Sequence, residues 1–196
     1  GGLVYSSRTS NVALSTLTLT GLTSNVTYHF RVGSLNWGGS ANLTTLGATR
    51  TVAAEIGVVI STENLDIGEV NLNVELVIST SFLVTSLGNV AQTYTLKAAT
   101  ATAGSPWTIS LSSATDTFTL QALFNSFQPS SGLFADDDKM LDSGTPCTAS
   151  AFSGDQSCVS VPDGAARLLW LKLGMPTISS TEAAQDIRII VTATFP

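Results

Sequence analysis

The sequence predicts an all-β protein, and three observations support this fold class. Short apolar segments with period-two alternation recur along the chain and are separated by Gly, Asn, Ser and Pro. The composition is rich in Thr, Ser, Ala, Gly and Val, which favours pleated strands and turns over helices. Of the 196 residues, 43% are hydrophobic and 11% are charged, so the chain can bury one large or two small cores.

The charge of the chain limits its partners. The formal net charge is −6, and the eight Lys and Arg residues are spread along the sequence without forming a basic stripe. We therefore expect no nucleic-acid partner and no binding to an anionic membrane surface. The longest apolar runs, such as 168–171, are too short to span a bilayer, so we also expect no membrane span.

The first strands are expected at 15–22, 26–36 and 42–51, after a short apolar cluster at 3–5. In the second of these, Tyr28, Phe30 and Val32 alternate with His29 and Arg31, which predicts one buried face. Leu43 and Leu46 supply apolar side chains to the third, and a Gly-containing hairpin loop at 36–40 joins the two. The position of Tyr28, six residues after Leu22, fits a tyrosine corner, in which the hydroxyl bonds to upstream backbone.

This stretch carries a family resemblance. The run L-T-G-L at 19–22, Tyr28, F-R-V at 30–32 and then Asn36 and Gly39 together resemble the last strands of a fibronectin type III domain. A complete sandwich of this general type has about seven strands in about 100 residues. The resemblance implies that residues 1–52 form only the C-terminal half of such a domain, because too few residues precede the pattern.

Three explanations for the absent half remain open. The given chain could begin in the middle of a domain, a cleaved N-terminal piece could remain bound as a separate chain, or a neighbouring subunit could add the absent strands. We favour the last two over the first, because an uncovered strand edge with half a core is prone to aggregate. Completion by a neighbour would be a head-to-tail contact, which propagates into a polymer.

A second domain is predicted at 58–196, after a short boundary. Val70, Leu72, Val74, Leu76 and Ile78 alternate with polar residues and predict the clearest strand of the chain. Further strands are expected where period two returns, at 58–60, 65–67, 82–84, 93–98, 107–111, 118–122, 167–173 and 186–195. This number of strands predicts an Ig-like β-sandwich.

Several phrases of the second domain are similar to bacterial and archaeal surface Ig-like domains. They are V-T-x-x-G-N-V-x-x-T-Y-T-L at 84–96, W-T-I-S-L at 107–111, V-P-D-G-x-x-R-L-L-W-L-K-L from 161, and D-I-R-I-I-V-T-A from 186. Such domains are found in secreted enzymes and surface-layer proteins. The resemblance implies an extracellular structural or adhesion module and implies no substrate.

A long insertion at about 125–160 departs from the plain sandwich. It carries both cysteines, Cys147 and Cys158, and we predict that they form a disulfide that pins the insertion. Two free buried thiols or half of a metal site are the alternatives, and the metal site ranks last because neither a CxxC motif nor a nearby His is present. The aromatic residues of the insertion indicate that it packs against the sandwich.

The acidic residues of the insertion suggest one cofactor hypothesis. Asp136, Asp137, Asp138 and Asp142 could supply oxygen ligands to Ca²⁺, although the spacing does not match an EF-hand. A solvated acidic loop is the alternative that we prefer. We expect no other cofactor.

The remaining candidate residues point to surface roles. His29, the one histidine, has no companion for a triad or a zinc site, and no G-x-S-x-G motif occurs, so we expect no enzyme activity. Asn25 and Asn42 begin N-x-T glycosylation sequons, although such triplets also arise by chance in a Thr-rich chain. Trp37, on the hairpin loop, is the candidate for an interface or a glycan contact, whereas Trp107 and Trp170 lie in strand patterns and are expected in the core.

The sequence thus predicts a secreted, non-enzymatic structural subunit of an extracellular filament or surface layer, which polymerises with itself by strand completion. The start at Gly1-Gly2 without Met supports a processed product located outside the cell or on its surface. The alternative is a carbohydrate-binding or accessory module of a secreted glycoside hydrolase. A third hypothesis is an adhesion domain that binds calcium.

Overall fold

The computed structural model describes residues 18–35, 38–61 and 64–196. Strands dominate these residues, and the helices among them are two short 3-10 turns, η1 (Ser131–Leu133) and η2 (Asp136–Asp138). The absence of α-helix from the described residues confirms the all-β prediction. No helix in this part of the chain is long and apolar enough to cross a membrane. The chain divides between Ala54 and Glu55 into two compact units.

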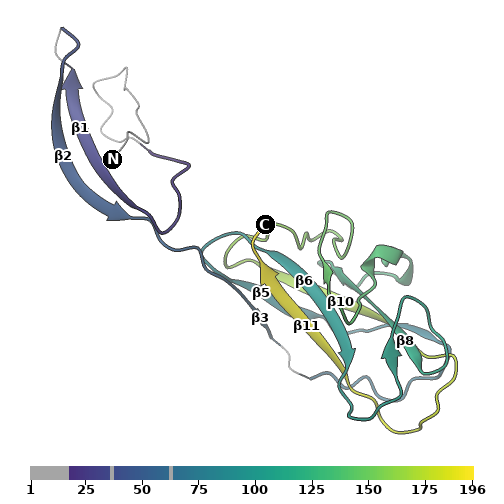
Figure 1. Ribbon diagram of the computed structural model, residues 1–196. Helices are drawn as coiled ribbons and strands as arrows, with labels where there is room; N and C mark the ends of the chain where they lie inside the picture. Colours follow the sequence, from purple (N-terminus) through teal and green to yellow (C-terminus); the bar gives the residue numbers. More distant parts are fainter. Residues whose placement is uncertain (1–17, 36–37, 62–63) are drawn as a thin grey trace. The chain divides into compact units, whose positions relative to one another are not determined.

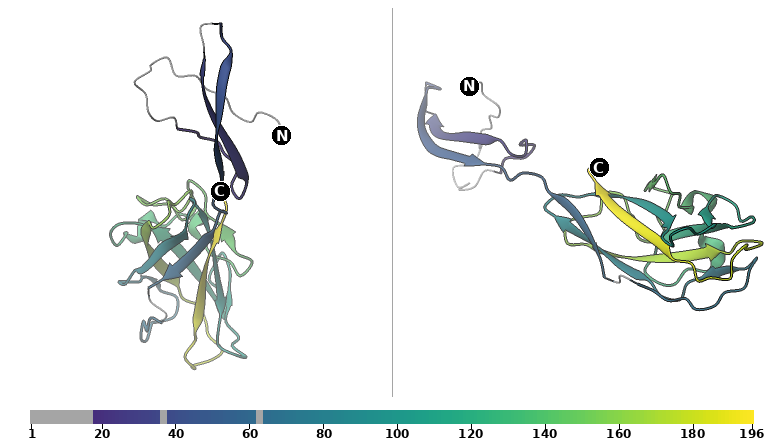
Figure 2. Two further views of the ribbon diagram at one scale, coloured as in Figure 1. Left: turned by 90° about the vertical axis from the view of Figure 1, so that its left-hand side faces the viewer. Right: turned by 60° about the horizontal axis from the view of Figure 1, so that its bottom comes forward.

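The first unit contains a two-stranded antiparallel sheet. Strand β1 (Thr27–Leu35) pairs with β2 (Ala41–Arg50), and the two twist about each other as a ribbon (Figures 1 and 2). The predicted strand at 15–22 is wrong for its described residues, 18–22, which form no strand. Gly21 adopts a left-handed φ of 72°, and this conformation interrupts an extended chain.

The second unit is built from nine described strands in two main sheets (Figure 1). A six-stranded sheet has the order β3-β5-β10-β8-β7, with β4 also paired to β10, and a three-stranded sheet has the order β11-β6-β9. The strands are β3 (Ile56–Ile60), β4 (Glu75–Val77), β5 (Phe82–Gly88), β6 (Thr93–Thr100), β7 (Thr108–Ile109), β8 (Thr117–Phe124), β9 (Thr145–Pro146), β10 (Ala166–Gly174) and β11 (Ile187–Thr194).

Strand β10 lies at the centre of the larger sheet. It pairs with β8 along one edge and with β5 and then β4 along the other. Its sequence RLLWLKL is apolar at nearly every position, because both faces of the strand are covered. Leu169, Leu171 and Leu173 join the main core, which also contains Tyr94 and Leu96 of β6 in the smaller sheet. The core of the second unit is therefore shared by its two main sheets.

The strand predicted at 70–78 is wrong over most of its length. Only Glu75–Val77 forms a strand, β4, and Leu72 and Val74 are 42% and 41% exposed. Asn73 adopts a left-handed φ of 57° and donates its N–H to the carbonyl of Pro176, so the chain turns just before β4 begins. Asn tolerates this conformation better than most residues. Period-two alternation therefore did not distinguish a paired strand from an unpaired segment here.

Candidate functional site

The hairpin β1–β2 of the first unit is the candidate site, and its base is fixed by two hydroxyl groups. The Tyr28 hydroxyl accepts a hydrogen bond from the backbone N–H of Thr23 at 2.9 Å, which confirms the predicted bond to upstream backbone. Thr51 Oγ1 donates to the carbonyl of Thr23 at 2.6 Å and accepts from the N–H of Val26 at 3.0 Å. These bonds tie the segment before β1 to the segment after β2.

The hairpin itself has no covered core among the described residues. No side chain described in the first unit is buried; Tyr28 and Phe30 are half-buried, and Val32 is 54% exposed. Leu43 and Leu46 of β2 are 57% and 67% exposed. The predicted buried face is therefore wrong at Val32, because nothing described in the first unit covers that end of the ribbon.

A β-bulge divides the apolar side chains of β2 between the two faces. The register passes from Phe30 opposite Gly47 to Arg31 opposite Thr45, which leaves Leu46 as the extra residue. Gly47 has a φ of 108°, a conformation that glycine adopts readily. Beyond the bulge Val32 lies opposite Thr44, while Leu43 lies opposite Gly33, so Val32 and Leu43 point to different faces.

Both long edges of the hairpin are unpaired in the described structure. β1 has nine residues and β2 has ten, and each pairs only with the other. An unpaired strand edge presents backbone N–H and C=O groups that can pair with another chain. The hairpin therefore has the chemistry of a strand-acceptor surface.

Several features of the second unit reduce the length of strand edge that another chain could pair with. At one end of the larger sheet, β7 has only two residues, and β9 of the smaller sheet is equally short and ends in Pro146. At the other end, Gly57 of β3 is bonded by the side chain of Gln92: Oε1 accepts from its N–H at 3.0 Å and Nε2 donates to its carbonyl at 2.5 Å. β11 lies next to β3. Among the described strands of the second unit, one longer edge remains, that of the eight-residue β11 (Ile187–Thr194), whose hydrogen-bonded neighbour is β6.

The sequence-predicted surface residues of the first unit lie at different places on the hairpin. His29 is exposed on β1, on the face opposite Tyr28 and Phe30. Asn25 is exposed in the turn before β1, with a φ of 59°, and Asn42 is exposed on β2 opposite Ser34. Both sequons are accessible, and their use stays a prediction. Trp37 lies outside the described residues, as does the apolar cluster at 3–5.

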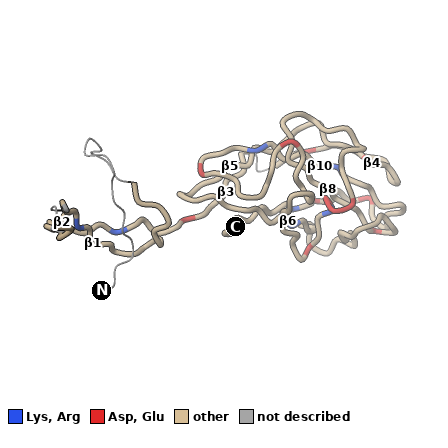
Figure 3. Tube along the Cα trace, turned by 90° about the horizontal axis from the view of Figure 1, so that it is seen from above, with Lys and Arg blue, Asp and Glu red and all other residues tan. Residues whose placement is uncertain are grey.

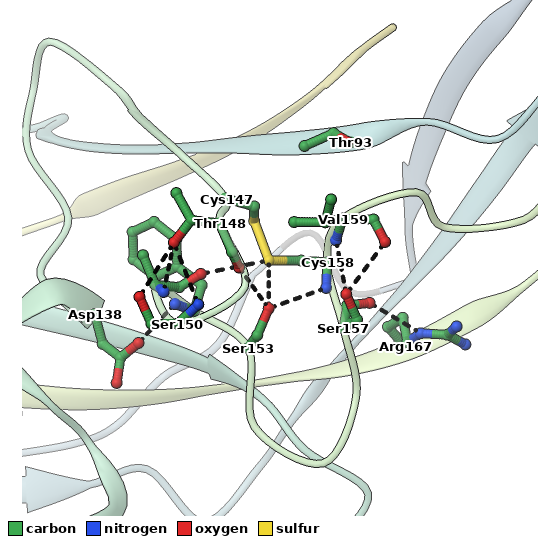
Figure 4. Close-up of a disulfide and its surroundings, with 12 residues drawn as sticks. Thr93, Asp138, Cys147, Thr148, Ser150, Ser153, Ser157, Cys158, Val159 and Arg167 are labelled. Carbon is green, nitrogen blue, oxygen red and sulfur yellow. Dashed lines mark hydrogen bonds between the residues drawn. A yellow bond between two sulfur atoms is a disulfide. The ribbon is translucent and has the colours of Figure 1, made fainter. Parts of the chain in front are cut away.

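The insertion of the second unit is pinned as predicted. Cys147 and Cys158 form a disulfide with 5.9 Å between their Cα atoms, and both residues are buried. The N–H of Cys147 donates to the carbonyl of Tyr94, and the N–H of Tyr94 donates to the carbonyl of Cys158, so both cysteines are tied to β6. Ser153 lies beside the disulfide and donates its hydroxyl to the carbonyl of Thr148 (Figure 4).

Packing of the insertion follows the prediction in part. Met140 and Phe152 are fully buried in the main core, and Phe134 packs with Leu123 and Trp170 in a second, smaller cluster. Phe127 is 77% exposed, in contrast to Phe134 and Phe152 of the same insertion. Trp107 and Trp170 are 8% and 9% exposed, which confirms their predicted place in the core.

The acidic residues of the insertion have protein partners. Asp138 is buried, and its carboxylate accepts hydrogen bonds from the N–H groups of Ala135 at 2.8 Å and Phe152 at 2.6 Å. Burial raises the pKa of the Asp138 carboxyl above its ordinary value, against the lowering effect of these two bonds. Asp136 pairs with Lys139 at 2.7 Å, which lowers the pKa of Asp136, and Asp142 pairs with Lys97 at 3.1 Å.

The calcium hypothesis gains no support from this geometry. The described residues contain no group of three or more His, Cys, Asp or Glu side chains that could hold a metal ion. Asp137 and Asp155 do line a hollow of about 450 Å³ together with Ser150 and Ser153. One Asp155 oxygen already accepts the N–H of Ser126 at 2.7 Å. The hollow thus carries polar groups that are largely engaged in holding the insertion.

Sequence reasoning missed the hydrogen bonds that the side chains of Thr51, Gln92 and Asp138 make to backbone groups. Thr and Gln at these positions carry no spacing signal, since their partners are 25 to 35 residues away in sequence. Asp138 did have a local signal, because Asp commonly accepts backbone N–H groups at the start of a short helical turn. Because three Asp residues follow one another, the sequence does not indicate which of them accepts the backbone N–H groups.

Comparisons of the chain with protein-family models, with curated proteins and with solved structures found no match.

Proposed function

We propose that this chain is a structural subunit of an extracellular filament or surface layer and that its copies assemble by strand completion of the first unit. In this proposal the first unit is the C-terminal half of a fibronectin type III-like domain, and the second is an Ig-like sandwich with a disulfide-pinned insertion. The proposed role is not enzymatic.

The observation that carries the proposal is the contrast between the two units. The hairpin of the first unit has two long open edges and no buried side chain among those described. A two-stranded ribbon without a covered face is at best marginally stable in water, so it requires a cover. The second unit has its own core, and its described edges are short or occupied except for that of β11. Strand addition to the hairpin would supply main-chain hydrogen bonds to an open edge and a third strand that widens the apolar face.

The disulfide supports the proposed location. Disulfides persist in oxidising compartments and are rare where thiols are kept reduced. The bond between Cys147 and Cys158 is therefore consistent with a secreted chain.

The alternative, a carbohydrate-binding or accessory module of a secreted glycoside hydrolase, has weaker support. A sugar-stacking platform needs exposed aromatic rings close together. Trp107 and Trp170 are buried, and Phe127 and Phe195 are the large aromatic side chains that are clearly exposed in the described structure. For the third hypothesis, a calcium-binding adhesion domain, the described residues offer no cluster of ligands.

Electron microscopy of the native material, paired with intact-mass analysis of the dissociated subunit, tests the proposal. We expect ordered filaments or layers whose subunit contains this chain, and sedimentation of the purified chain should show concentration-dependent self-association. A chain that remains a monodisperse monomer at every concentration, in native and purified material, would overturn the proposal and favour the accessory module.

A further inference from the structure

The two units carry charge of opposite sign, which gives the chain an electrostatic polarity. The first unit contains three Arg residues and no Asp or Glu, whereas the second contains five Lys and Arg residues and all fourteen Asp and Glu residues. Their formal charges are thus +3 and −9. Figure 3 shows the described hairpin with basic residues alone. Opposite charges on two surfaces of one chain favour contact between unlike surfaces of two copies.

Of the two open edges, that of β1 is better suited to accept a strand. The bulge at Leu46 and Gly47 interrupts β2, and a bulge bends its strand and turns an edge away from pairing. β1 has nine successive residues without an extra residue. Regular spacing of N–H and C=O groups is the requirement for a ladder of hydrogen bonds.

The two faces of β1 have different chemistry. Phe30 and Val32 point to one face, and Val32 is 54% exposed there. His29 and Arg31 point to the other face, and both are exposed. A strand added beside β1 is thus best matched when it presents apolar side chains on one face and acidic or polar side chains on the other.

One described segment of the second unit has this pattern and lies outside the strands. Residues 69–74, with the sequence EVNLNV, alternate Glu69, Asn71 and Asn73 with Val70, Leu72 and Val74. Leu72 and Val74 are more than 40% exposed, and no hydrogen bond or ion pair of the Glu69 side chain is found. The segment is held at two places: Val70 packs against the main core, and just after β10 the N–H of Met175 donates to the carbonyl of Val74 while the N–H of Asn73 donates to the carbonyl of Pro176.

From this match we infer that residues 69–74 of one copy add as a strand to β1 of the next copy. Val70, which leaves its packing against the main core, and Leu72 then extend the apolar face of Phe30 and Val32, and Glu69 lies on the face of His29 and Arg31. The charges set the orientation, while backbone pairing and apolar contact supply affinity. Straightening the segment releases Asn73 from its left-handed turn and exchanges its bond to Pro176 for pairing with β1.

A charge-swap experiment with the full chain tests this inference, which rests on the proposed self-assembly. Arg31→Glu and Glu69→Arg should each weaken self-association, measured by sedimentation over a concentration series, by roughly tenfold. An equimolar mixture of the two variants should recover association, because each reversed hairpin then meets a reversed segment. Arg188→Glu and Glu182→Arg are matched controls, since both residues are exposed in the second unit and neither belongs to the segment 69–74 or to the hairpin.

The outcomes separate this inference from the proposed function. If the native chain associates but neither swap weakens it, or the mixture fails to recover, the pairing of 69–74 with β1 is wrong and assembly proceeds through another surface. If the native chain never associates, the proposed function itself fails.

Disulfide trapping gives a second readout that does not depend on charge. A copy with Val32→Cys mixed with a copy with Leu72→Cys should form a cross-linked dimer on a non-reducing gel. A copy with Ile178→Cys, a residue that is 60% exposed, is the control and should not cross-link to Val32→Cys. Equal cross-linking of the two pairs would overturn the inference.

Discussion

At the residue scale, three side chains in this protein bond to backbone groups that a strand would otherwise pair. Tyr28 and Thr51 bond to the segment before β1, and Gln92 bonds to both polar groups of Gly57 in β3. Each bond fixes a chain segment where no neighbouring strand is present. Such contacts are individually modest, near 1 kcal/mol, but they determine which edges remain open.

Tyr28→Phe should loosen the base of the hairpin without unfolding the second unit. The variant loses the acceptor for the Thr23 N–H, and because this bond is exposed we expect a loss of about 1 kcal/mol or less in local stability. Amide hydrogen exchange should show faster exchange at Thr23. Thr49→Val, on the same face of the neighbouring strand, is the control. Unchanged exchange at Thr23 would contradict the role assigned to the hydroxyl.

Asp138 should make stability depend on pH with a defined sign. Burial raises the pKa of its carboxyl in the folded chain above the ordinary value of 3.8, so folding favours the protonated form. The stability that this group contributes is therefore fully present below pH 3.8 and is lost as the pH rises through the raised folded pKa.

The comparison with Asp138→Asn isolates this effect, because the variant does not titrate. In urea unfolding from about pH 3 to about pH 7, the native chain should lose free energy of unfolding relative to Asp138→Asn as the pH rises. Asp137→Asn, at the exposed neighbouring position, is the control and should run parallel to the native chain. A difference between native and Asp138→Asn that stays constant with pH would show that Asp138 does not titrate differently on folding.

At the element scale, the insertion is stabilised by its disulfide and by its aromatic side chains together. Phe134 packs on Trp170 and Leu123, and Phe152 enters the main core. Replacing Cys147 and Cys158 by Ser should lower the free energy of unfolding by about 3 kcal/mol, the value expected for a closed loop of this size. Chemical unfolding under non-reducing conditions measures this loss. Native chain treated with a reductant should match the variant, and a loss well below 1 kcal/mol would mean that packing alone holds the insertion.

Some elements of the fold could be predicted from the sequence, and others could not. Strand β10 was predictable because a run such as RLLWLKL has to be covered on both faces. The disulfide and the Tyr28 hydroxyl bond were predictable because they depend on short sequence separations. The segment 70–74 was not, because its alternation specifies two faces but not a partner strand, and the turn at Asn73 gives no signal in the sequence.

The distribution of side chains between the two faces of the hairpin could not be predicted from the sequence either. Which apolar residues share a face depends on the bulge at Leu46, and one extra residue moves all later side chains of β2 to the other face. Leu43 and Val32 consequently lie on different faces. An open strand edge in the first unit was expected from the sequence, but the bulge that distinguishes the edge of β2 from that of β1 was not.

At the scale of the whole molecule, the separation of charge predicts a salt dependence. If copies associate through the basic first unit and the acidic second unit, raising the salt concentration from about 0.05 M to about 0.5 M should weaken self-association, since the Debye length falls well below 10 Å. Sedimentation measures the shift. Association that strengthens with salt would instead indicate purely apolar contacts.

The short strands of the second unit have a consequence for the geometry of growth. Because β7 and β9 have two residues each and Gln92 covers β3 at Gly57, this unit offers few places for lateral addition. In the inferred arrangement, each copy binds one neighbour through β1 and a second neighbour through residues 69–74. Each copy therefore has two attachment points. Particles with two attachment points form unbranched lines, whereas a two-dimensional lattice requires at least three. If copies pair as proposed, we therefore expect a filament rather than a layer.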